Sequence, residues 1–352
     1  MSATAATPRL PSLDRDASRS AQPLWEYVGQ SGLQSLVACA SKNPNAKFTV
    51  LLVSPATRRI VHAVKVPTTD IAAAAIEAEA QMLLELQRAT TRVAGTIPRL
   101  VDLVEFGGRV GIVMTAVTGT PMTTSYLRSR HTARPAAVAA DFAAVDAWLT
   151  DFQNGTSGTT AAVDMDAGVA AGLSARFADH AALAEALDRL AQIHASLRTN
   201  VVPRTAVHGD LWFGNVLVSG TRASGIVDWE AGELAGEPLR DLARFAHMYA
   251  LFLDRRTRRG RTVAGHRGLR AGDWGAGVAF AVDGTGWFPE LFRRFLRDGL
   301  ARLGASPAHW RDLALAGVAE VAGLADEDEY ARHHLELFLE LSRAAPTQGG
   351  DR

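Results

Sequence analysis

Three side chains that bear oxygen lie in one short stretch of the sequence: Asp210, Asn215 and Asp228. Two short apolar runs joined by the turn from Ser219 to Ser224 predict a hairpin that brings all three toward its open end. One carboxylate can accept a proton from an attacking hydroxyl group. The other carboxylate and the amide oxygen can hold Mg²⁺, which prefers hard oxygen ligands.

The same stretch resembles the aminoglycoside phosphotransferase family, whose kinase-like fold also includes choline, fructosamine and homoserine kinases. The matching residues are His208-Gly209-Asp210, Asn215, Asp228-Trp229-Glu230 and, further on, Pro238 and Asp241-Leu242-Ala243. The resemblance implies that Asp210 is the catalytic base, that Asn215 and Asp228 hold Mg²⁺, and that His208 has a structural role. ATP and Mg²⁺ are the cofactors it implies.

A kinase also needs a cation on the nucleotide phosphates and a carboxylate that orients this cation. Lys65, near the end of a strand-like run, resembles the strand lysine of the family. Glu77, Glu79 and Glu85 on the following helix compete as its partner. Glu79 shares a helical face with the apolar stripe and is preferred, with Glu77 on a more polar stripe as the alternative.

Adenine recognition in such folds uses backbone groups of the segment that joins the two lobes. The candidate segment here is Thr115 to Val117, with Thr115 and Val117 as the nucleotide-binding residues, although an ordinary buried strand has the same pattern. The first turn, Ser41 to Ala46, lacks the G-x-G-x-x-G loop over the phosphates. This departure leaves open which groups of the turn contact ATP.

The residues that would bind the acceptor give opposing signals. The acidic cluster Asp326 to Glu329 could hold a cationic acceptor, but carboxylates are also favoured at the start of a helix. Seven arginines and no acid lie between residues 255 and 270; they are Arg255, Arg256, Arg258, Arg259, Arg261, Arg267 and Arg270. This arginine-rich loop is expected to repel a polycation and to attract an anionic partner, unless it is only a solvated loop.

The elements that would position these residues change character along the chain. Short apolar runs between turn residues, with one helix near 70–88, predict a five-stranded antiparallel sheet over residues 30–118. Beyond Gly119 the helical period dominates, with helices expected at 135–152, 180–198, 238–253, 286–303, 308–324 and 328–343 and a loop at 153–168.

The expected fold class is therefore α+β, a bilobal protein kinase-like fold. Residues 24–118 form the nucleotide-binding N-lobe in this interpretation, and residues 119–345 form the helical C-lobe that carries catalysis and substrate binding. Residues 1–23 and 346–352 are expected to be flexible tails.

Composition excludes several classes of protein. The 352 residues carry 37 Lys and Arg against 37 Asp and Glu, which argues against a nucleic-acid binder. The single cysteine, Cys39, excludes an internal disulfide framework. No apolar run approaches the roughly 20 residues of a spanning helix, and the N-terminal stretch lacks the apolar core of a secretory signal. We therefore expect a cytoplasmic protein without stable membrane insertion.

These observations favour an ATP- and Mg²⁺-dependent phosphotransferase that acts on a hydroxyl of a small polar molecule, such as a sugar, an antibiotic or an amino alcohol. One alternative keeps the chemistry but makes the acceptor a Ser or Thr hydroxyl of a peptide. A second alternative is a nucleotide-binding pseudokinase scaffold without turnover.

Overall fold

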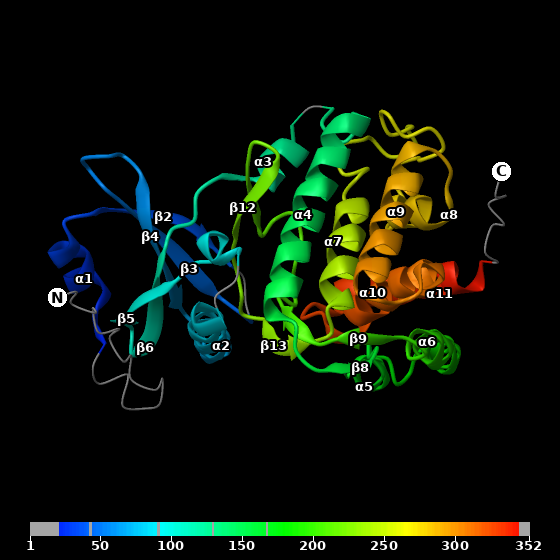
Figure 1. Ribbon diagram of the computed structural model, residues 1–352, viewed down its shortest axis with the longest axis horizontal. Coiled ribbons are helices and arrows are strands. Elements are labelled where there is room, and N and C mark those ends of the chain that lie inside the picture. The colour runs from blue at the N-terminus through cyan, green and yellow to red at the C-terminus, as the bar shows by residue number, and fades with distance from the viewer. Residues whose placement is uncertain (1–20, 42–43, 90–91, 129, 167, 345–352) are drawn as a thin grey trace. The chain divides into compact units, whose positions relative to one another are not determined.

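The computed structural model describes residues 21–41, 44–89, 92–128, 130–166 and 168–344. The chain divides into two compact units (Figure 1). The first unit comprises residues 1–87 and 98–116, and the second comprises residues 88–97 and 117–352. Most of the two expected tails, 1–20 and 346–352, lies outside the described residues.

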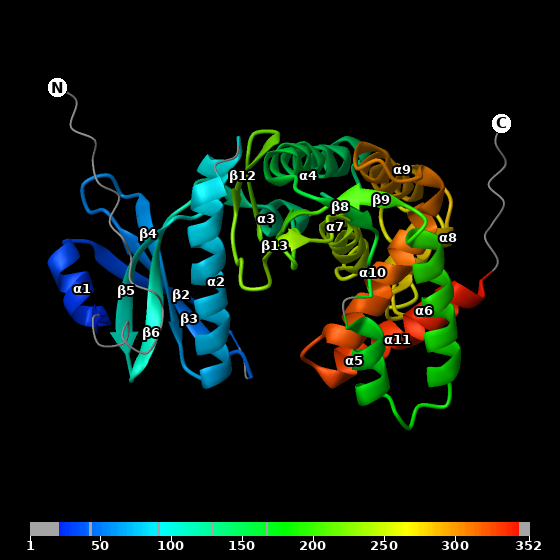
Figure 2. The same cartoon turned by 60° about the horizontal axis from the view of Figure 1, so that its bottom comes forward.

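The first unit is a six-stranded sheet in the order β1-β5-β6-β4-β3-β2, with α1 and α2 on its opposite faces (Figure 2). Its elements are β1 (Gln22–Pro23), α1 (Leu24–Ser31), β2 (Gln34–Ala40), β3 (Lys47–Val53), β4 (Ile60–Pro67), α2 (Asp70–Ala89), β5 (Leu100–Phe106) and β6 (Arg109–Thr115). Strand β1 runs parallel to β5, and the other neighbours are antiparallel.

Strand β4 shows why the sheet is covered on both faces. Val64 and Val66 are fully buried and pack in one cluster with Leu24 of α1. Side chains alternate between the faces of a strand, so Lys65 points to the opposite face. There it meets α2, whose buried stripe includes Ile76 and Glu79.

The five strands and one helix predicted over residues 30–118 are present as β2 to β6 and α2, but the sheet has a sixth strand and the unit a second helix that begins before this range. Gln22 and Pro23, expected in the flexible tail, pair with Val104 and Glu105 as the additional strand β1. A two-residue strand is too short to show an alternating pattern, and it forms because the edge of β5 offers backbone partners. The additional helix, α1, follows directly and buries Leu24.

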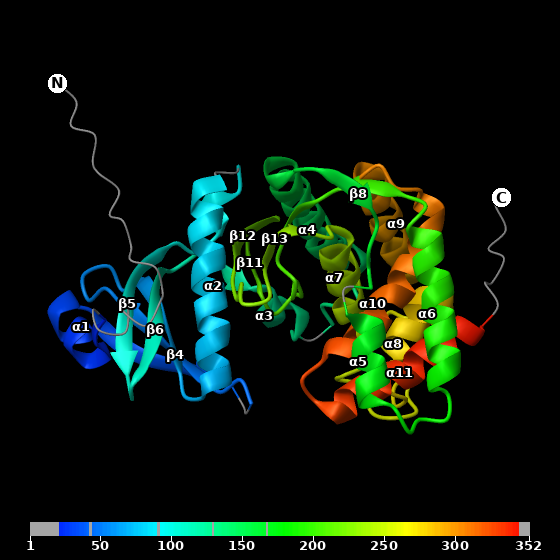
Figure 3. The same cartoon turned by 90° about the horizontal axis from the view of Figure 1, so that it is seen from below.

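The second unit is mostly helical (Figures 1 and 3). Its helices are η2 (Ala94–Thr96), α3 (Met122–Tyr126), α4 (Pro135–Thr156), α5 (Val169–Arg176), α6 (Leu183–Leu197), α7 (Leu239–Leu251), α8 (Ala276–Asp283), α9 (Trp287–Arg302), η3 (Pro307–His309), α10 (Trp310–Leu324) and α11 (Asp328–Arg343). Helix α10 packs against α5, α6, α7, α9 and α11, and it is buried along most of its length.

Three small sheets complete the second unit. Their strands are β7 (Thr120–Pro121), β8 (Thr160–Ala162), β9 (Val201–Pro203), β10 (Thr205–Val207), β11 (Val216–Ser219), β12 (Arg222–Ile226) and β13 (Glu233–Gly236). The predicted hairpin is β11–β12, and β7 pairs with its β11 edge. Strands β10 and β13 pair antiparallel, as do β8 and β9.

The loop expected at residues 153–168 is shorter than predicted. Helix α4 continues to Thr156, because the buried Gln153 donates to the carbonyl of Pro238 at 3.1 Å and accepts from Arg302 at 2.7 Å. These tertiary contacts override the loop-like composition. Strand β8 and helices α3, α5 and α8 were also not predicted.

None of the described helices is long and apolar enough to cross a membrane.

Candidate active site

The loop between β10 and β11 is anchored on Asp241, in the first turn of α7. The backbone amides of His208 and Gly209 donate to its two carboxylate oxygens at 2.7 and 2.9 Å. Asp241 is only 1% exposed, and burial raises its pKa, while His208 and the two amide donors counteract this rise. A carboxylate with two amide donors holds the start of the loop in one conformation.

The ring of His208 ties this loop to the end of β12. Nε2 donates to the carbonyl of Val227 at 2.9 Å, and Nδ1 accepts from the amide of Asp210 at 3.2 Å. The ring lies 4.7 Å from that of Trp229, which is fully buried and donates to the carbonyl of Ile226 at 3.0 Å. These contacts agree with the structural role expected of His208.

Gly209 allows the sharp turn before Asp210. Its φ of +78° lies in the left-handed region, and a Cβ atom here would lie 2.0 Å from the carbonyl oxygen of Ala231. Only glycine satisfies both conditions without moving the backbone.

The carboxylate of Asp210 is held from two sides and remains 33% exposed. Nε and Nη2 of Arg244 donate to its Oδ1 at 2.9 and 2.6 Å. Nδ2 of Asn215 donates to the main-chain carbonyl of Asp210 at 3.0 Å and to Oδ2 at 3.3 Å. The carboxylate thus has a fixed orientation and remains partly accessible.

Asn215 and Asp228 lie at the same end of the hairpin. Val216 pairs with Ile226, and the amide of Val227 donates to the carbonyl of Asn215 at 3.0 Å. Asp228 follows with a φ of +73°, a strained conformation for a non-glycine residue that is frequent at functional sites.

The donor set at this end of the hairpin suits Mg²⁺. The described residues contain no cluster of three or more His, Cys, Asp or Glu side chains that could hold a metal ion. Mg²⁺ is usually held by one or two carboxylates together with substrate phosphates. One carboxylate from Asp228 and one amide oxygen from Asn215 fit this pattern.

Lys65 and Glu79 form a buried ion pair in the first unit. The Nζ atom of Lys65 lies 2.7 and 2.6 Å from the two carboxylate oxygens of Glu79, and the residues are 8% and 0% exposed. The preference for Glu79 is therefore confirmed as far as the pairing goes. Glu77, the alternative, is exposed on α2.

The expected adenine-binding segment begins at the end of β6. The amides of Thr115 and Ala116 donate to the carbonyls of Arg99 and Val61, both at 2.9 Å. The amide of Val117 makes no backbone hydrogen bond within the described residues. Val117 packs on the hairpin, since a Cβ atom on Gly225 would lie 2.6 Å from its Cγ2.

Arg244 is the residue of this site that the sequence did not suggest. It lies three positions after Asp241 on α7, a helix whose other residues are almost all buried. A buried arginine needs a partner of opposite charge, so its place on a buried helix could have indicated an ion pair. Sequence alone does not show that Asp210 is this partner.

Comparison with known proteins shows the family of the chain. Residues 44–276 match the model of the phosphotransferase enzyme family. The chain belongs to that family. The matched residues include Lys65, Glu79, Asp210 and Arg244, and the predicted phosphotransferase class is confirmed. No curated protein matches the chain.

Solved structures with the same fold include aminoglycoside phosphotransferase APH(4)-Ia. Its ternary complex with AMP-PNP and hygromycin B is 13% identical, with a TM-score of 0.53 over 90% of this chain and 95% of that one. Its apo form is 15% identical, with a TM-score of 0.52 over 91% and 99%. The predicted kinase-like α+β fold is therefore confirmed for this member of the phosphotransferase enzyme family.

Proposed function

We propose that the protein transfers the γ-phosphoryl group of ATP to a hydroxyl group of a small polar molecule, with Mg²⁺ as cofactor. The observation that carries the proposal is the partly exposed carboxylate of Asp210, oriented by Arg244 and Asn215. A fixed carboxylate beside a hydroxyl group is what a base for phosphoryl transfer requires.

In the proposed reaction, Asp210 orients the acceptor hydroxyl and takes its proton. The hydroxyl oxygen forms a bond to the γ-phosphorus, the bond from that phosphorus to the bridging oxygen breaks, and ADP leaves. Arg244 keeps Asp210 in place and offsets its negative charge during approach of the phosphate. Little covalent chemistry falls to the protein, so positioning and charge stabilisation carry the catalysis.

Lys65 is assigned to the nucleotide phosphates, with Glu79 fixing the position of its ammonium group. The Val117 amide is assigned to the adenine, and Thr115 to the same segment. Asn215 uses Nδ2 on Asp210, so its Oδ1 would join the Asp228 carboxylate as a ligand of Mg²⁺. The ion, when bound, supplies positive charge on the phosphate oxygens.

The related structure of APH(4)-Ia contains an ATP analogue and hygromycin B, which supports a small-molecule acceptor. A sugar, an antibiotic and an amino alcohol are the candidate acceptors. The need for ATP places the proposed reaction in the cytoplasm. The arginine-rich loop is proposed to face an anionic partner.

The test is release of ADP from ATP and Mg²⁺ across a panel of aminoglycosides, sugars, amino alcohols and Ser/Thr peptides. We expect release that depends on a small-molecule acceptor and falls about 10²- to 10⁴-fold in Asp210→Asn, a variant of nearly equal volume. Release of ADP with the peptides alone would show instead that the acceptor is a Ser or Thr hydroxyl group of a peptide. Binding of ATP without release of ADP for any member of the panel would favour the alternative of a nucleotide-binding pseudokinase scaffold without turnover.

A further inference from the structure

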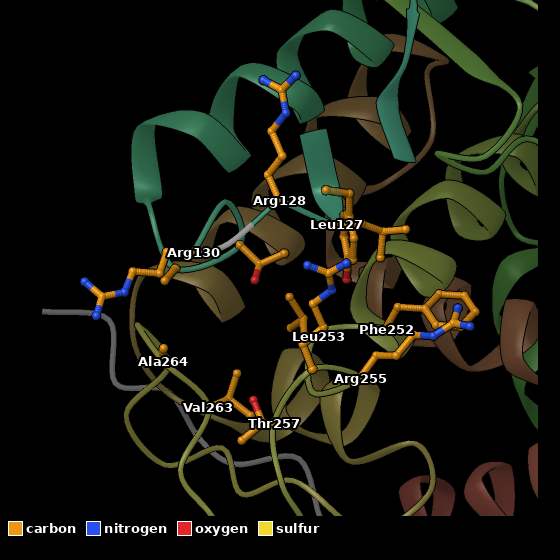
Figure 4. A pocket seen from close by; sticks show the side chains of 13 residues that line it. Leu127, Arg128, Arg130, Phe252, Leu253, Arg255, Thr257, Val263 and Ala264 are labelled. Atoms are coloured by element: carbon orange, nitrogen blue, oxygen red, sulfur yellow. The ribbon is translucent and has the colours of Figure 1, made fainter. Parts of the chain in front are cut away.

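A cavity of about 320 Å³ lies in the second unit between the chain after α3 and the chain after α7 (Figure 4). Leu127, Arg128 and Arg130 line it from the first segment. Phe252 and Arg255 are among the residues that line it from the second. Its volume is in the range of small-molecule sites. We call it the arginine cavity.

The charge around the arginine cavity has one sign. Four of the lining residues are Arg128, Arg130, Arg255 and Arg256, and no lining residue is acidic. None of the four guanidinium groups is in an ion pair with a carboxylate of the described residues. Two come from each segment, and all four side chains are exposed.

Two contacts describe the surroundings of Arg255 at the cavity wall. Asp254, beside Arg255 in the chain, accepts a hydrogen bond from the amide of Gly272 at 3.3 Å. The guanidinium carbon of Arg255 lies 5.2 Å from the ring centre of Phe252, which holds this arginine at the cavity wall. A guanidinium group binds carboxylate and phosphate oxygens through paired hydrogen bonds.

The arginine cavity adjoins the loop that carries Asp210. The ring of Tyr126, another lining residue, stacks on Phe213 at 4.2 Å. The ring of Phe252 lies 5.8 Å from Phe213 and 6.3 Å from Trp212. Trp212 and Phe213 follow Asp210 by two and three positions, so the cavity wall and the catalytic loop form one packed unit.

We propose that the acceptor is an anionic small molecule, a hydroxyl compound with a phosphate or carboxylate group, and that the arginine cavity binds this anionic group. The proposal rests on the proposed function and narrows its acceptor class. It excludes polycationic aminoglycosides as preferred acceptors, because four unpaired guanidinium groups repel them.

The test measures binding by calorimetry on the intact chain, with saturating AMP-PNP and Mg²⁺ so that the probes do not occupy the nucleotide site. The probes are glucose 6-phosphate and gluconate, which separate the two anionic groups, with neutral glucose and cationic kanamycin as controls. Arg128→Gln and Arg255→Gln remove cavity charges. Arg267→Gln removes the same charge from the same arginine-rich loop without lining the cavity.

We expect at least one anionic probe to bind at least tenfold more tightly than glucose. Each cavity variant should weaken the binding of this probe about tenfold, because it removes one charge-assisted hydrogen bond. Arg267→Gln should leave binding within about twofold, since this exposed charge does not line the cavity and is screened by salt. Equal binding of glucose, tighter binding of kanamycin, or equal weakening by Arg267→Gln would overturn the proposal.

Binding is measured without turnover, so the inference and the proposed function can fail separately. Asp210→Asn should lower phosphoryl transfer about 10²- to 10⁴-fold, and the anionic probe should still bind to this variant. Anion binding by a chain that transfers no phosphate would contradict the proposed function only. Transfer to a neutral or cationic acceptor, without anion binding, would contradict the inference only.

Discussion

At the scale of single residues, the site depends on how each charged group is held. Asp210 receives two hydrogen bonds from Arg244 on one oxygen and a longer one from Asn215 on the other. The partner of Arg244 lies 34 positions earlier in the chain, so the fold, and not local sequence, creates this pair. Arg244 therefore orients the base rather than reacting itself.

Replacing Arg244 by Gln should lower kcat about 10- to 100-fold while the KM for ATP changes little, because only the orientation of Asp210 is lost. Steady-state kinetics measure this, with Arg198→Gln, an exposed arginine on the same unit, as the matched control. An unchanged kcat in Arg244→Gln would show that Asp210 needs no such support.

At the scale of elements, the loop between β10 and β11 requires a left-handed residue. Gly209→Ala should destabilise the fold by about 3 kcal/mol, since strain at positive φ adds to a clash with Ala231. Gly220→Ala, with φ +61° but no atom within 4 Å of the added Cβ, should cost about 1 kcal/mol. Urea unfolding of both variants measures the difference, and equal costs would refute the role of the close approach.

Helices α7 and α11 meet through a pair of buried histidines. Nε2 of His247 lies 2.9 Å from Nε2 of His334, and burial lowers the pKa of His334 to about 3. Burial also lowers the pKa of His247 well below its usual value, helped by the charge of Arg244 and by His334. In the folded state these rings stay neutral where the unfolded chain binds protons.

The free energy of unfolding should therefore decrease as pH falls from about 6.5 toward 3, by about 1.4 kcal/mol per pH unit for each such histidine. The stabilisation is fully present above the unfolded pKa and is lost as pH falls toward the folded pKa. In His334→Gln one of the two contributions is gone, so urea unfolding between pH 4 and 6 should show a shallower slope. The same slope as in the unmodified chain would contradict this assignment.

Elements with a strong apolar period were predictable, and those fixed by tertiary contacts were not. Helices α7, α9, α10 and α11 lie within a few residues of their expected ranges. Strand β1 exists only through its pairing with β5, and α4 extends through Gln153 because of contacts to distant segments. In the site, the spacing of residues in the sequence predicted Asp210, Asn215 and Asp228. The role of Arg244 became visible only in the folded structure, where it contacts Asp210.

At the scale of the whole molecule, the proposed chemistry draws on both units. The first carries the buried pair of Lys65 and Glu79, and the second carries Asp210, Asn215 and Asp228. Neither set alone accounts for transfer, because one is assigned to the nucleotide phosphates and the other to the acceptor and Mg²⁺.

Lys65→Met should abolish transfer and destabilise the protein by about 3–5 kcal/mol, since the buried carboxylate of Glu79 would lose the ammonium group that lies against it. The double variant Lys65→Met/Glu79→Leu should regain most of the stability, because apolar residues replace the buried pair, and should stay inactive. Thermal unfolding and ADP release measure the two effects. Activity in the stable double variant would remove Lys65 from the proposed mechanism.

The central claim is that Asp210 drives transfer of the γ-phosphoryl group to a hydroxyl group. The most direct measurement uses ³¹P NMR to follow the phosphorus resonances in a mixture of ATP, Mg²⁺ and an acceptor, with the unmodified protein and with Asp210→Asn. The account predicts a phosphate-ester resonance on the acceptor as the γ-phosphate signal decays, and its near absence in the variant. An ester formed equally fast by Asp210→Asn, or release of inorganic phosphate alone, would contradict it.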